Sequence, residues 1–70
     1  MRLSARNQLP ATVVRVTQGA VMAEVLVEVD GGHEIVAAIT AESVRRLGIG
    51  PGSRVVVVIK STEVMLAVDD

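Results

Sequence analysis

Residues 20–39 read AVMAEVLVEVDGGHEIVAAI, and this stretch decides the fold class. Glu24, Leu26 and Glu28 alternate with three valines at 25, 27 and 29, which is typical of a β-strand with one buried face. The letters DGG at 30–32 predict a tight turn, because glycine tolerates a positive φ. The segment HEIVAAI at 33–39, apolar from Ile35 onward, then predicts a returning strand. The centre of the chain is therefore expected to be a β-hairpin.

Three further strands are expected around this hairpin, at 10–18, 54–61 and 62–68. Alternation in the first of them predicts that Val13 and Val16 lie on opposite faces. The unbroken apolar run from Val55 to Ile59 predicts burial of both faces of its strand. Residues 1–9 are expected to form an additional edge strand or an arm.

One short helix is expected between the third and fourth strands. Thr40 can cap its first turn, Glu42 suits the positive end of the helix dipole, and Gly48 can stop it after Leu47. This order of elements predicts an all-β fold, a small OB-like Greek-key barrel of about five strands that forms one domain over 1–70. An SH3-like barrel is the structural alternative.

Composition narrows the classes of function. The 70 residues contain no cysteine and one histidine, which excludes disulfides and zinc clusters, so no metal held directly by side chains is expected. The absence of aromatic residues and a net charge of -1 argue against nucleic-acid binding. His33 has no evident nucleophile or carboxylate partner, so an enzyme is not expected. Without a leader or a long apolar run, the chain is expected in the cytoplasm, with no membrane partner.

The length of the chain also predicts self-association. A domain of this size buries only about 60% of the surface that its unfolded chain exposes. Fifteen valines and no aromatic ring supply little buried area per residue, and no disulfide can add stability. Subunits that share a core are the remaining explanation, so a homo-oligomer is expected.

Hydrogen-bond donors cluster in three segments, at 4–8, 39–44 and 59–62. They offer hydroxyls, backbone N–H groups and two permanent cations, Arg6 and Lys60, with Thr40 and Ser43 at the helix start. A set of donors without acceptors suits an oxyanion. The alternative is structural: Thr40 caps the helix, Arg6 and Asn7 tie down an arm, and Lys60 is a solvated edge residue.

The segments SARNQLP at 4–10, ITAES at 39–43 and IKSTEVML at 59–66 together resemble the Mop domain of the molbindins. Molbindins are small cytoplasmic molybdate-binding proteins related to TOBE domains, and the resemblance covers nearly the whole chain. It implies an OB-like barrel, a hexamer built as a trimer of dimers, and storage or homeostasis of molybdate or tungstate at subunit interfaces. The contacts that it implies are Ser4, the backbone of Ala5, Arg6, Thr40, Ser43, Lys60 and Ser61.

The sequence departs from the family pattern at two adjacent residues. Pro10 and Ala11 stand where the family often has a glycine, which predicts a changed turn there and no changed ligand. Two other functions stay open: a structural β-barrel oligomer that holds a partner protein, and, ranked lower, an OB-type nucleic-acid binder.

Overall fold

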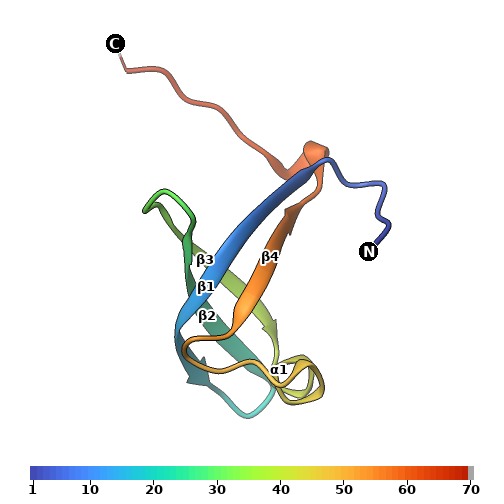
Figure 1. The fold of residues 1–70 in the computed structure, drawn as a ribbon, viewed down its shortest axis with the longest axis vertical. Helices are drawn as coiled ribbons and strands as arrows, with labels where there is room; N and C mark the ends of the chain where they lie inside the picture. The colour runs from blue at the N-terminus through green and yellow to red at the C-terminus, as the bar shows by residue number, and fades with distance from the viewer. Residues whose placement is uncertain (70) are drawn as a thin grey trace.

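The computed structural model describes residues 1–69 and shows a four-stranded antiparallel sheet curled into a half-barrel (Figure 1). The predicted all-β class, with a helix between the third and fourth strands, is confirmed. The sheet order is β3-β2-β1-β4, so within the described residues β3 and β4 have a neighbour on one side only. In chain order the elements are β1 (Asn7–Gln18), β2 (Met22–Val29), β3 (Glu34–Thr40), α1 (Ala41–Leu47), β4 (Arg54–Ile59) and the 3₁₀ turn η1 (Ser61–Glu63).

The predicted central hairpin is formed by β2 and β3. Their register runs from Met22 opposite Thr40 to Glu28 opposite Glu34. Val25 and Val27 are buried, as the alternation predicted. Gly31 and Gly32 have φ values of 107° and 104°, a backbone conformation that L side chains rarely adopt. The turn therefore depends on these glycines.

Strand β1 contains a β-bulge that the alternation did not predict. Val13 lies opposite Val27 on β2, but the next paired residue is Arg15, so Val14 is an extra residue. Because a bulge restarts the alternation, Val13 and Val16 both pack into the core, and the prediction that they lie on opposite faces is wrong. The predicted turn at 10–11 is also wrong, because both residues lie inside β1.

The core lies on the concave side of the half-barrel. Its buried members come from β1, β2 and α1: Ala11, Val13, Ala23, Val25, Val27 and Val44. From β4, Val55 and Val57 pack against this cluster, whereas Val56 and Val58 remain 43% and 42% exposed. The predicted burial of both β4 faces is therefore wrong for a single chain, because no described element covers the outer face.

The predicted fifth strand at 62–68 is absent from the described chain. After Ile59 the backbone makes the η1 turn, and residues 64–69, called the tail below, run away from the sheet (Figure 1). The tail pairs with neither of the open sheet edges, β3 and β4, within residues 1–69. At the other terminus, residues 1–6 form an arm and β1 begins at Asn7.

Helix α1 has the predicted caps. The Thr40 Oγ1 accepts a hydrogen bond from the Ser43 N–H at 3.0 Å. Gly48 adopts the left-handed conformation at φ 66° and donates its N–H to the Arg45 carbonyl. Over residues 1–69, no helix has the length and apolar character needed to cross a membrane.

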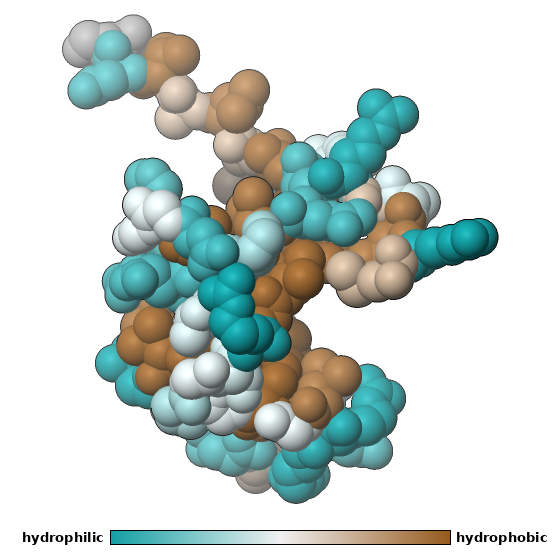
Figure 2. All heavy atoms as spheres, viewed as in Figure 1, coloured by the Kyte–Doolittle hydropathy of each residue, from teal (hydrophilic) through white to brown (hydrophobic). Residues whose placement is uncertain are grey.

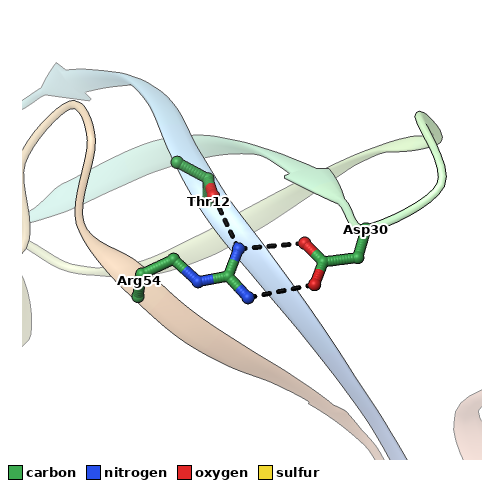
Figure 3. Close-up of polar contacts among 3 residues, drawn as sticks. All are labelled: Thr12, Asp30 and Arg54. Atoms are coloured by element: carbon green, nitrogen blue, oxygen red, sulfur yellow. Dashed lines mark hydrogen bonds and ion pairs between the residues drawn. The ribbon is translucent and has the colours of Figure 1, made fainter.

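An exposed ion pair and a hydrogen bond join β1, β4 and the turn after β2 (Figure 3). Arg54, the first residue of β4, donates from Nη1 to Asp30 Oδ1 at 2.9 Å and from Nη2 to Oδ2 at 3.0 Å. The same Nη1 also donates to Thr12 Oγ1 on β1 at 2.8 Å. The hydrogen bonds and the positive charge of Arg54 lower the pKa of Asp30. Because both side chains are solvated, the pair contributes little to stability.

Replacing Arg54 by methionine should raise the pKa of Asp30 toward its ordinary value of 3.8, because the hydrogen bonds and the charge are lost. A lowered pKa stabilises the fold above the unfolded-state pKa, and this contribution disappears as the pH falls through the folded-state pKa. The Arg54→Met variant should therefore lose less stability on acidification. NMR titration of the Asp30 carboxyl measures the shift, and Arg15→Met is the matched control. An unchanged Asp30 pKa in Arg54→Met would contradict the assignment.

Candidate functional site

The structure brings five of the seven expected contact residues to one end of the sheet. Asn7 lies opposite Ile59 where β1 begins and β4 ends, and its Nδ2 donates to the Ile59 carbonyl at 3.1 Å. The chain segments on either side of this pair carry Ser4, Ala5, Arg6, Lys60 and Ser61, called the donor end below. Residues more than 50 positions apart in sequence therefore meet at one place.

The donor end faces solvent. Ser4, Arg6, Lys60 and Ser61 are exposed and Ala5 is half-buried. The Gln8 Nε2 donates to the Ala5 carbonyl at 2.8 Å, which folds the arm locally and leaves the hydroxyls and cations available. The arm is thus tied down through Asn7 and Gln8, and the cations Arg6 and Lys60 both belong to this end.

The other two expected contacts, Thr40 and Ser43, lie at the start of α1, called the helix end below. The Thr40 hydroxyl donates to Ser43 Oγ at 2.7 Å while accepting from the Ser43 N–H. The Thr40 proton is therefore used in the cap. The Ser43 hydroxyl proton is the one that this pair can still offer to a ligand.

The two ends are too far apart to share one small anion within a chain. The donor end lies beside Asn7, whereas Thr40 pairs with Met22 near the far end of β1. A strand of 12 residues spans roughly 35 Å at about 3.3 Å per residue. Figure 1 shows the turn after β4 and helix α1 at opposite ends of the sheet. A site that used both ends would need donors from more than one chain.

Two hollows in the described residues do not coincide with these donors. A hollow of about 230 Å³ on the concave side is lined by valine, alanine and isoleucine side chains. A groove of about 630 Å³ lies between Met1, the end of α1 and the start of β4, with Leu47, Ile49 and Val55 among its lining residues. None of the seven expected contacts lines either one, so a single chain presents donors without enclosing them.

The residues described, 1–69, also hold no group of three or more histidine, aspartate or glutamate side chains that could bind a metal ion. The feature that the sequence did not reveal is η1 itself, because residues 62–68 read as a strand. The only local signal of a break was the polar triplet Ser61-Thr62-Glu63 after the apolar β4. This turn sets where Lys60 and Ser61 lie relative to the tail.

The model of the TOBE domain family matches residues 3–66. The chain belongs to the TOBE domain family. This TOBE domain is 46% identical over 66 residues to molybdenum-pterin-binding protein 1 of Clostridium pasteurianum, covering 94% of this chain and 97% of that protein. The resemblance to the Mop and TOBE proteins that the sequence motifs predicted is confirmed.

Solved structures agree with the TOBE assignment. MopII from Clostridium pasteurianum superimposes with a TM-score of 0.91 at 43% identity, over 96% of this chain and 100% of that one. The cytoplasmic molybdate-binding protein ModG, solved with molybdate bound, gives a TM-score of 0.84 at 43% identity over 87% of this chain and 43% of ModG. The TOBE fold of this chain is therefore that of known Mop-type domains.

Removing the side-chain amide that joins the two donor segments should loosen the donor end of this TOBE domain. In Asn7→Ala, the Ile59 carbonyl loses its partner, which should lower the free energy of unfolding by about 1 kcal/mol. Amide hydrogen exchange at 4–6 and 60–61 should become faster. Denaturant titration and exchange mass spectrometry measure both effects. Gln8→Ala, which removes an exposed local bond, should stay within about 0.5 kcal/mol of wild type. Equal losses in both variants would contradict this role of Asn7.

Proposed function

We propose that this chain binds the oxyanion molybdate, and tungstate with it, at interfaces between copies of itself. Its role is storage and homeostasis of the anion in the cytoplasm rather than catalysis. The observation that carries the proposal is the donor end, where two cations and several uncommitted donors meet beside the Asn7–Ile59 pair. Similarity to molybdenum-pterin-binding protein 1 and to the molybdate-bound structure of ModG supports the choice of ligand.

The chemistry of the donor end favours this anion. Molybdate is a tetrahedral dianion without a proton at neutral pH, so it accepts hydrogen bonds on every side. Arg6, Lys60 and the serine hydroxyls supply donors, two of them permanently charged. Monohydrogen phosphate carries an O–H that would face donors and stay unpaired, which costs binding energy. Sulfate is smaller than molybdate, so cavity size must exclude it, whereas tungstate is nearly the same size.

The ligand in this proposal is the free oxyanion, although some relatives are named for a molybdenum pterin. A pterin ring is a flat aromatic heterocycle, and proteins commonly bind such rings by stacking aromatic side chains on them. This chain has no phenylalanine, tyrosine or tryptophan. The donor end offers charge and hydroxyl groups, which match an inorganic anion better than a ring.

Uncovered apolar surface supports assembly into an oligomer, and it lies in two places that adjoin along β4, where Val56 and Val58 also line the hollow. One is the hollow of the half-barrel together with the tail, where Met65 and Leu66 are 91% and 94% exposed. Figure 2 shows apolar side chains along the tail and on the concave side of the molecule. The other is the outer face of β4, with Val56 and Val58 beside Pro10 of β1. Water would otherwise contact both surfaces.

Two distinct interfaces can build an assembly larger than a dimer. In the first, the tail of one copy would add as a strand to an open edge, β3 or β4, of another copy and cover its hollow. In the second, the outer β4 faces would pack against each other or against a neighbouring surface. A trimer of dimers uses two kinds of contact, so a hexamer is the assembly that we propose. Such contacts would also bring donors of different chains together.

The oligomer can be tested by sedimentation of the purified chain. The expected mass is six times the 7.3 kDa of one chain. Leu66→Ser should weaken the assembly, because a polar hydroxyl would replace an apolar contact of the tail. Val21→Ser changes an exposed valine in the loop between β1 and β2 and should leave the mass unchanged. A stably folded wild-type monomer at micromolar concentration would contradict the proposed assembly.

The ligand can be tested by calorimetric titration with molybdate, sulfate and phosphate. Molybdate should bind, and Lys60→Met should weaken its binding roughly tenfold to a hundredfold, because a charge-assisted hydrogen bond worth about 1.5–3 kcal/mol is lost. Arg45→Met, on the exposed side of α1, is the control and should change affinity by less than about twofold. Equal binding of phosphate and molybdate, or unchanged affinity in Lys60→Met with an intact oligomer, would contradict the assigned site.

A further inference from the structure

The donor end and the tail meet at the η1 turn. Lys60 and Ser61 are candidate contacts for the anion, and their carbonyls also accept the two hydrogen bonds that shape the turn. The Glu63 N–H donates to the Lys60 carbonyl at 2.9 Å, and the Val64 N–H donates to the Ser61 carbonyl at 3.4 Å. The side chains of these two residues can therefore hold a ligand while their backbone sets the direction in which the tail leaves.

The η1 turn is held by a side-chain hydrogen bond on its β4 side, whereas the tail on its other side is exposed. On the β4 side, the Asn7 amide fixes the Ile59 carbonyl next to the arm that carries Arg6. On the tail side, Met65, Leu66 and Val68 are each more than four-fifths exposed. Lys60 itself makes no side-chain hydrogen bond to the turn that it precedes. Within the described chain, the direction of the tail thus depends on the backbone of η1 alone.

We propose that η1 couples anion binding to docking of the tail on a second copy of the chain. This inference rests on the proposed function and adds its regulation. An anion held by Lys60, Ser61 and Arg6 would fix the turn and restrict the tail to one direction. Ordering the tail before it docks reduces the entropy lost on assembly. Because binding linkage is reciprocal, a docked tail would in turn raise the affinity for the anion.

The experiment measures assembly of the full chain by sedimentation over a dilution series, with saturating molybdate or with sulfate at equal ionic strength. Leu66→Ser provides a background in which the oligomer dissociates at accessible concentrations. Molybdate should lower the protein concentration at which half of the oligomer dissociates by about tenfold, whereas sulfate should leave it unchanged. A tenfold change is within the usual range of coupling free energies between two sites. Calorimetry should show the reciprocal effect, with weaker molybdate binding in Leu66→Ser than in the Val21→Ser control.

A second pair of variants tests whether the turn carries the coupling. Thr62 lies inside η1 and is not a candidate contact for the anion. Thr62→Gly should loosen the turn, whereas Thr62→Ala restricts the backbone more, since alanine has a Cβ. Molybdate should still bind both variants. The molybdate-induced shift in the concentration at half-dissociation should be at least about threefold smaller in Thr62→Gly than in Thr62→Ala.

The possible outcomes separate the two proposals. A molybdate-specific shift that shrinks in Thr62→Gly supports the coupling. Molybdate binding with no shift, or with an equal shift in Thr62→Gly and Thr62→Ala, overturns the coupling and leaves the proposed function standing. A failure of wild-type chain to bind molybdate in calorimetry overturns both.

Discussion

Strand β1 is hydrogen-bonded to β2 along one edge and to β4 along the other, and the remaining elements reach the sheet through these pairings. Its bulge turns both Val13 and Val16 toward the core, and its two ends lie next to the two groups of donors, at Ile59 and at Ala41. The length of this one strand therefore separates the donor end from the helix end. A half-barrel, and not a closed barrel, follows because no described strand joins β3 to β4.

The sequence predicted those elements that are determined by interactions between residues close together in the chain. The alternation in β2, the glycines of the 30–32 turn and the caps of α1 all act within a few residues, and the structure has each of them. The bulge at Val14 was not predictable in this way, since it depends on how β1 meets two partners at once. The tail was predicted as a strand because its apolar composition suits one, but no described neighbour receives it.

In the candidate site, too, the local features were predictable from the sequence and the long-range arrangement was not. The residue types of the donor segments, and their resemblance to Mop proteins, could be recognised from the sequence. The grouping of these segments in space could not be predicted from the sequence, because it is the pairing of Asn7 with Ile59 that brings residues 4–6 beside 60–61. The structure also separates two kinds of hydroxyl. The Thr40 proton is used within the helix cap, whereas Ser4 and Ser61 lie exposed beside the cations. Residue type alone does not distinguish these situations.

The bulge in β1 has a consequence for how related chains should be compared. On its two sides the strand follows opposite parities, with inward side chains at odd positions through Val13 and at the even position Val16. Deleting Val14 would restore one-to-one pairing of β1 with β2, and Val13 and Val16 would both still face the core. A related chain that lacks the bulge therefore keeps the same inward residues, and its alignment gap belongs at Val14. A one-residue deletion in the regularly paired part of β1, with the bulge kept, would instead turn the residues beyond it to the other face, so a single-residue gap in this strand is expected at Val14.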